Sequence, residues 1–254
     1  MRRLRGFVIA LLLIAGVGGA AYVAYVRFVQ GPTLADALRR YGPGARARMR
    51  PFVTRAGISY PPRRLTLLVF KRERRLSSWA EDRGRWRYLR AYPVLAASGN
   101  AGPKLREGDY QVPEGLYRIA WLNPASAYHL SMKVDYPNAF DRLMAARDGR
   151  TRLGGDIFIH GRNLSIGCVA IGDPAIEELF TLVADTGADR VRVVIAPNDL
   201  RARGAVAAPL APRWIGKLYD SIAAALRDFP LVEESDLAFD VRGMGKDAKV
   251  LAVH

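Results

Sequence analysis

Short apolar segments separated by turn residues dominate the sequence between residues 65 and 196. The segments are rich in aliphatic, β-branched and aromatic residues, and glycine and proline cluster between them. We expect strands at Leu65–Lys71, Trp86–Val94, Tyr110–Val112, Tyr117–Leu122, Tyr128–Val134, Asp156–His160, Cys168–Ile171 and Val191–Ala196. Strands this short and this closely spaced predict a mainly antiparallel sheet or sandwich.

Two segments have the pattern of amphipathic helices. In the first, Asp173 can cap the helix, Pro174 suits its first position, and apolar residues follow at helical spacing. The second, Trp214 to Phe229, lies in the C-terminal part of the chain. The predicted fold class is therefore mainly β with a few helices.

The N-terminus carries an uncharged run from Phe7 to Val26. Its 20 residues would form a helix about 30 Å long, which matches the apolar core of a bilayer. Arginines at positions 2, 3 and 5 favour a cytoplasmic N-terminus, so the rest of the chain should lie outside. We expect residues 1–29 to form a signal anchor, a single transmembrane helix. A cleaved signal peptide is the alternative, although its apolar region is normally shorter, about 7–15 residues.

Residues 30–62 are predicted to form a basic linker, with a short helix from Leu34 to Arg40 followed by turn-rich sequence. Residues 1–110 hold 22 of the 39 lysines and arginines but 6 of the 24 acidic residues. This basic N-terminal part suits an anionic membrane surface, an acidic wall polymer or nucleic acid. We expect no nucleic-acid partner, because the predicted topology places this segment outside the cytoplasm.

The single cysteine lies in the segment DIFIHGRNLSIGCVAIGD, residues 156–173. A hairpin of this length can bring the imidazole of His160 close to Cys168, and a neighbouring histidine can activate a thiol. Gly161 and Gly167 would let the backbone approach a substrate closely. The N–H groups of Gly167 and Cys168 are candidates to stabilise an oxyanion.

Two other interpretations use the same residues. A lone cysteine in a strand is often a small buried apolar residue, and a histidine near a turn is often only a satisfied polar group. His129, His160 and Cys168 have the right ligand types for zinc, but no compact ligand pair supports a site. We therefore expect neither a metal nor another cofactor.

At these residues the sequence resembles the L,D-transpeptidase catalytic-domain (YkuD-like) family. The HG pair followed by S-x-G-C resembles the family's signature. Two upstream segments agree with it in order, GPKLREGDYQVPEGLY at 102–117 and YHLSMKVDYPNAFD at 128–141. The resemblance implies a YkuD-like β-sandwich over residues 63–197, with residues 198–254 as a C-terminal extension.

The resemblance also assigns roles to individual residues. It implies that Cys168 is the nucleophile and His160 the general base, and that the carbonyl of Gly161 orients the histidine. Ser165 and Gly167 match the residues that frame the nucleophile.

The motif departs from the usual family pattern. Ile166 stands where most members have histidine, Ala170 stands where they have arginine, and the His-to-Cys spacing is short. These features resemble a compact branch that includes proteins that cleave envelope amide links. Arg162 is a candidate to replace the missing positive charge near a substrate carboxylate. The other residues expected to line or support the cleft are Lys104, Tyr128, His129, Tyr136 and Asn138.

The resemblance implies a cysteine acyltransferase that acts on peptidoglycan stem peptides through a thioacyl-enzyme. Hydrolysis of the same class of bond, including release of wall-attached protein, is the alternative. A non-catalytic, membrane-tethered wall-binding module is a second alternative, and an unreactive Cys168 thiol would identify it. Together with the predicted anchor, this function predicts a bacterial inner-membrane protein with its catalytic domain in the periplasm. The alternative is a protein that is cleaved and secreted.

Overall fold

The computed structural model describes residues 31–206, 208, 211–233 and 236–237. The expected membrane helix at residues 1–29 lies outside these residues, as does much of the C-terminal extension. Within the described ranges, every helix is too short or too polar to cross a membrane.

Eight strands of the described residues form one sheet in the order β3-β2-β1-β8-β4-β5-β6-β7. The strands are β1 (Leu65–Phe70), β2 (Arg75–Asp82), β3 (Arg85–Pro93), β4 (Gly115–Asn123), β5 (Ser131–Val134), β6 (Phe158–His160), β7 (Val169–Ala170) and β8 (Val191–Ala196). The pairs β1–β8 and β6–β7 are parallel, and the others are antiparallel.

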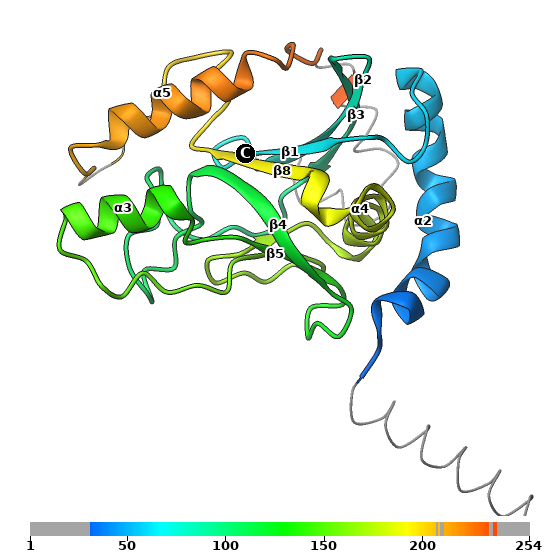
Figure 1. Cartoon of the computed structure of the whole chain (residues 1–254), viewed down its shortest axis with the longest axis horizontal. Coiled ribbons are helices and arrows are strands. Elements are labelled where there is room, and N and C mark those ends of the chain that lie inside the picture. Colours follow the sequence, from blue (N-terminus) through cyan, green and yellow to red (C-terminus); the bar gives the residue numbers. More distant parts are fainter. Residues whose placement is uncertain (1–30, 207, 209–210, 234–235, 238–254) are drawn as a thin grey trace, which may run out of the picture.

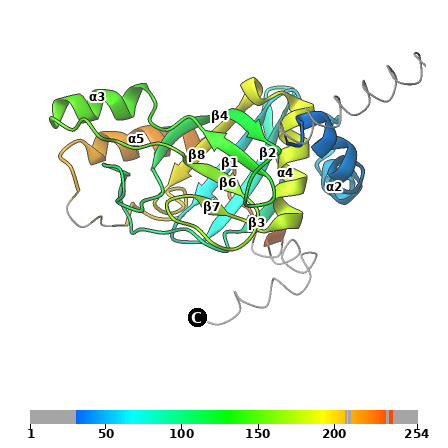
Figure 2. The same cartoon turned by 90° about the horizontal axis from the view of Figure 1, so that it is seen from below.

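The sheet curls so that its two ends approach each other. Ala96, which follows β3, forms a bridge with Ala170 of β7 at the opposite end of the strand order. The prediction of a mainly β fold with a few helices is confirmed. The strands form one continuous curled sheet instead of the two stacked sheets of a simple sandwich (Figures 1 and 2).

The helices lie on both faces of the curled sheet, and one of them packs inside the curl, in a core that it shares with strands from both ends of the sheet (Figure 1). They are α2 (Leu34–Ala56), α3 (Ala139–Arg147), α4 (Asp173–Thr186) and α5 (Ile215–Leu226), with a short 3-10 turn η1 (Ala188–Arg190). Helices α4 and α5 lie in the two segments predicted to be helical. Asp173 is the first residue of α4, however, and Gly172 is its cap, without a side-chain hydrogen bond.

Helix α2 replaces the turn-rich linker that we expected after Arg40, so that prediction was wrong. Thr33 and Asp36 form a capping box at its start, and Gly57 ends it in the left-handed conformation, with φ 66°. The helix passes through two prolines, Pro43 and Pro51. Each interior proline costs about 3 kcal/mol, so other interactions must stabilise this helix.

Packing against α4 supplies that stabilisation (Figures 1 and 2). The buried face of α2 consists of Ala37, Gly42, Ala45, Met49, Phe52 and Val53. Arg46 pairs with Asp185 at 2.7 Å, and Arg48 pairs with Glu178 at 2.7 Å. Burial of each large apolar side chain contributes about 1.5–3 kcal/mol, enough to offset the prolines. Tertiary contacts thus override the local turn signals.

The two halves of the sheet differ in how their faces are covered. We call β3, β2, β1 and β8 the covered half. In β1, Leu67 and Val69 pack in a core with α2 and α4, while Leu68 and Phe70 pack in a second core with α5. We call β4, β5, β6 and β7 the open half. One of its faces joins the first core, and the other carries the residues of the candidate site.

Candidate active site

Strand register brings His160 and Cys168 to the same face of the open half. Met132, Ile159 and Val169 of neighbouring strands are paired and point into the core. Because side chains alternate along a strand, His160 points away from that core. Val169 is paired with Ile159, so Cys168, one residue earlier, lies opposite Phe158. Phe158 is two residues before His160 in β6.

The connection between the two residues differs from the predicted hairpin. Strands β6 and β7 run parallel, with His160 paired to Ala170, so the loop 161–168 turns back before β7 begins. A lateral spacing of about 4.8 Å and a two-residue displacement put the Cα atoms of His160 and Cys168 about 8 Å apart. Two side chains that lean toward each other can span that distance.

The imidazole of His160 is buried and held in one orientation. Its Nδ1 lies 2.7 Å from the carbonyl oxygen of Gly161, the contact that the resemblance implied. A carbonyl only accepts, so Nδ1 carries the proton and Nε2 has a free lone pair. Burial lowers the pKa of His160 below its ordinary value of 6.5, only partly offset by the Gly161 hydrogen bond. The side chain is thus a neutral base at neutral pH.

Gly161 is required by packing. A Cβ atom there would lie 2.6 Å from Oδ1 of Asp173, 2.8 Å from the carbonyl oxygen of Tyr128 and 3.0 Å from Cγ2 of Ile176. The chain's own atoms fill the space on the Cβ side of Gly161, so the close approach there is between parts of the chain itself.

The thiol of Cys168 is partly buried and protonated at rest. Burial raises its pKa, while the backbone N–H of Phe158 and the charge of Lys133 act in the opposite direction. Its Sγ donates to the carbonyl oxygen of Asp156 at 3.5 Å, an ordinary distance for a sulfur hydrogen bond. Among the hydrogen bonds of the described residues, none joins this thiol to the imidazole of His160. The thiol must therefore turn from the Asp156 carbonyl toward Nε2 before the base can take its proton.

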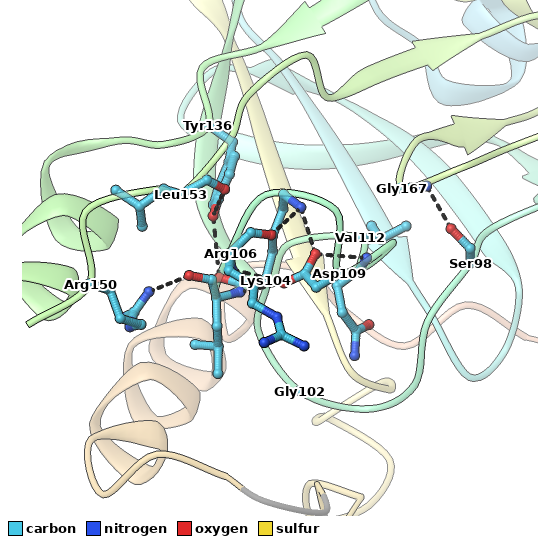
Figure 3. A network of polar contacts seen from close by, with 12 residues as sticks. Ser98, Gly102, Lys104, Arg106, Asp109, Val112, Tyr136, Arg150, Leu153 and Gly167 are labelled. Atoms are coloured by element: carbon cyan, nitrogen blue, oxygen red, sulfur yellow. Dashed lines mark hydrogen bonds and ion pairs between the residues drawn. The ribbon is translucent and has the colours of Figure 1, made fainter. Parts of the chain in front are cut away.

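The two N–H groups that we expected to stabilise an oxyanion each donate a hydrogen bond to a serine hydroxyl. The N–H of Cys168 donates to Oγ of Ser165 at 3.0 Å, and that hydroxyl donates to the carbonyl of Cys168 at 2.5 Å. The N–H of Gly167 donates to Oγ of Ser98 at 2.6 Å (Figure 3). Gly167 has φ 91°, a conformation that favours glycine. Both serines must turn or share these donors before an oxyanion can use them.

Comparison with known proteins shows the family of the chain. Residues 64–195 match the family described as YkuD, L,D-transpeptidase catalytic domain. The chain belongs to this family. It is 34% identical over 134 residues to the putative L,D-transpeptidase YafK of Escherichia coli strains K12 and O157:H7, a match that covers 51% of this chain and 52% of YafK. The match thus spans about half the length of these curated relatives.

A solved structure also resembles the chain. It is the helical cell shape determining protein Pgp2 from Campylobacter jejuni, with 22% sequence identity and a TM-score of 0.46. The match covers 59% of this chain and 56% of that one.

The positions at which this chain departs from the usual L,D-transpeptidase motif differ in their surroundings. Ile166 is 71% exposed in the loop before the cysteine, beside the similarly exposed Leu164. Ala170 is fully buried in β7. Arg162 is exposed; its backbone N–H donates to Oδ1 of Asp173 at 2.7 Å, which holds the loop to α4.

Lys104 and Tyr136 hold the loop between β3 and β4 beside the site (Figure 3). The ammonium of Lys104 binds Oδ1 of Asp109 at 2.6 Å and the carbonyl of Arg106 at 2.9 Å. Tyr136 donates to the carbonyls of Lys104 and Leu153, both at 3.3 Å. These contacts support the loop, and the charge of Lys104 also acts to lower the pKa of Cys168.

Tyr128 and His129 are neighbours that make different contacts. The ring of Tyr128 lies 4.7 Å from that of His160, between centroids, and so helps to fix the base. His129 instead contacts Glu177 of α4, with Nε2 and Oε1 3.0 Å apart, and the ring of Tyr41 of α2. The structure therefore gives no support to the substrate-binding role predicted for His129.

Asn138 is the cap of α3. Its side chain accepts from the N–H of Asp141 at 3.1 Å and donates to the carbonyl of Leu116 at 2.9 Å. These contacts make it a structural residue and leave its predicted role in the cleft unsupported. Within the ranges that the structure describes, no group of three histidine, cysteine or acidic side chains is arranged to hold a metal.

Sequence reasoning missed three residues near the thiol, namely Ser98, Lys133 and Asp156. Lys133 pairs with Phe158 and shares its face, and its ammonium lies 2.5 Å from Oδ1 of Asp156. Each of the three comes from a different segment. Only strand register and loop packing bring them together, so no local pattern could have identified them.

Proposed function

We propose that this chain is a peptidoglycan-modifying cysteine acyltransferase of the L,D-transpeptidase type. The observation that carries the proposal is the fixed imidazole of His160, whose Nε2 is free to act as a base on the sheet face that also carries Cys168. Membership of the family supplies the substrate class, amide bonds of peptidoglycan stem peptides.

The proposed reaction uses the two side chains in sequence. Nε2 of His160 takes the thiol proton, and Sγ of Cys168 attacks the amide carbonyl carbon of the third stem-peptide residue. The tetrahedral intermediate collapses as the C–N bond breaks, and the imidazolium protonates the leaving amine. The product is a thioester at Cys168. An acceptor amine or water then attacks it while His160 takes the acceptor's proton, and the thiol is regenerated.

The same thioester serves a transpeptidase and a hydrolase, and the acceptor decides between them. Leu164 and Ile166, in the loop before the thiol, are exposed, so both acceptors remain candidates in this proposal. Transpeptidation is the function that we propose first, with hydrolysis, including release of wall-attached protein, as the alternative outcome.

The location that we propose is the periplasmic face of a bacterial inner membrane. The uncharged run from Phe7 to Val26 and the arginines before it support this location. The basic N-terminal part would then lie near an anionic membrane or wall surface. Protease treatment of spheroplasts should digest the catalytic domain while the inner membrane is intact, and its protection would contradict the proposed topology.

The test of the activity is incubation of the full chain with defined muropeptides and identification of the products by mass. Cross-linked products would identify a transpeptidase, and shortened stem peptides a hydrolase. A Cys168→Ala protein should form neither. If that variant processes muropeptides as the wild type does, or if the wild-type thiol is inert to labelling, the proposal fails and a wall-binding module is the better description.

A further inference from the structure

Lys133 lies in the same row of the sheet as the proposed nucleophile. It pairs with Trp121 of β4 on one side and with Phe158 of β6 on the other. By the register of β6 and β7, Cys168 follows next in that row. Directly paired residues of neighbouring strands point to the same face, so the Lys133 side chain shares the face of the thiol.

The side chain of Lys133 is mostly buried and packs beside an aromatic ring. It is 18% exposed, and Nζ lies 5.0 Å from the centre of the Phe158 ring. A cation on a mostly buried side chain is stabilised by a counter-ion. Asp156 supplies one, with Oδ1 2.5 Å from Nζ, yet the Asp156 side chain is 90% exposed.

This ion pair is unequal, because the lysine side chain is mostly buried and the aspartate side chain is almost fully exposed. The Asp156 carboxylate would lose little by moving into solvent, since an exposed carboxylate is well hydrated and exposed pairs contribute little stability. Lys133 would then need another carboxylate in the same place.

Lys104, the other lysine whose charge acts on the thiol, is bound differently. Its side chain is 6% exposed and that of its partner Asp109 is 12% exposed, so both ends of this pair are enclosed. Asp109 also accepts from the backbone N–H groups of Leu105, Arg106 and Gln111. That pair is fixed by its loop (Figure 3). Lys133 is therefore the better candidate for a cation whose partner can be exchanged.

We infer that Lys133 binds a carboxylate of the substrate beside Cys168, and that the Asp156 carboxylate occupies this position until the substrate enters. The inference rests on the proposed function, since it names the part of the stem peptide that the site recognises. Two sources carry this chemistry: the terminal carboxylate of the peptide and the side-chain carboxylate of the diamino acid.

Binding measurements on the full chain in a Cys168→Ala background test the inference without turnover. Three muropeptides serve as probes, one with free carboxylates, one with the terminal carboxylate converted to carboxamide, and one with the diamino acid carboxylate so converted. One of the two amidations should weaken binding by about 10- to 100-fold, the usual effect of removing a charge-assisted hydrogen bond. The amidation that does so identifies the source of the carboxylate.

Matched variants show whether Lys133 causes the preference for the free carboxylate. Lys133→Gln should lose the preference for the free carboxylate, and Lys133→Arg should retain most of it. Asp156→Asn should bind the free muropeptide at least as tightly as the parent, because a competing carboxylate is gone. Lys217→Gln, the same change on the exposed side of α5, should have no effect.

The inference is overturned if neither amidation weakens binding, or if Lys133→Gln keeps the preference. Turnover can be measured with Lys133→Gln in protein that keeps Cys168. If this substitution slows the turnover of all three probes equally, Lys133 acts on the thiolate alone and the inference is also overturned. The proposed function fails separately, through lack of turnover by the protein with its cysteine intact. The binding preference can be measured in either case.

Discussion

The covered and open halves of the sheet show how one fold separates stability from chemistry. In the covered half, β1 is buried at every position, and its side chains pack into a core on each face. In the open half, β4 alternates between buried and exposed positions over its first six residues. One face there contributes to the core, and the other is free to carry Lys133, His160 and Cys168.

The difference follows from the sequences of the strands. A continuous apolar run such as LTLLVF must be covered on both sides, so helices are needed on both faces. An alternating strand leaves one face for polar side chains. We therefore expect substitutions in the covered half to affect stability, and substitutions on the open face to affect activity.

A matched pair of tryptophans gives the largest test of this comparison. Trp79 is 1% exposed and packs on Phe229, whereas Trp121 of the open face is 47% exposed. Trp79→Ala should lower the free energy of unfolding by about 3–5 kcal/mol and leave kcat/KM of the folded fraction unchanged. Trp121→Ala should lower it by less than about 1 kcal/mol. Denaturant titration measures both, and equal losses would break the comparison.

Gly161→Ala is a smaller change at the border between the core and the open face. The new methyl group would meet Asp173, Tyr128 and Ile176 at 3.0 Å or less. We expect a loss of about 1–3 kcal/mol in unfolding free energy. Activity should also fall, because the Gly161 carbonyl would move away from Nδ1 of His160. Gly155→Ala, with no atom within 4 Å of its added Cβ, is the control and should change neither quantity.

The smallest expected effect is on the pH dependence of activity. Burial lowers the pKa of His160, so the imidazole should stay neutral, and active as a base, below its ordinary pKa of 6.5. The acid limb of kcat/KM should therefore have its midpoint below pH 6.5. A pH profile of muropeptide processing measures this midpoint. A midpoint at or above the ordinary value would show that His160 is solvated or paired with the thiolate in the free enzyme.

Much of the sheet could be predicted from apolar runs, and the exceptions have physical causes. Strand β2 was missed because its sequence, RLSSWAED, is largely polar; it is buried because it lies between β1 and β3. The strand predicted at Tyr110–Val112 does not form, and Tyr110 has φ 54°. Helix α3 was also missed, although Asn138 and Asp141 already have the spacing of a capping box.

The candidate site was predictable where its residues are close in sequence. His160, Gly161, Ser165 and Cys168 lie within one short motif, and family resemblance supplied their roles. Lys133 and Asp156 are 23 residues apart and meet only because β5 pairs with β6. Their partnership depends on register, which residue patterns alone did not reveal.

The central claim is that Cys168 forms a thioester with a stem peptide and that His160 activates it. The most direct measurement is the intact mass of the full chain after rapid quenching with a muropeptide substrate, followed by mapping of the modified residue. The account predicts an added acyl fragment on Cys168 in the wild type, and its loss or strong reduction in His160→Gln. Two results would contradict the account. One is turnover by the wild type without any adduct on Cys168, and the other is undiminished activity of Cys168→Ala.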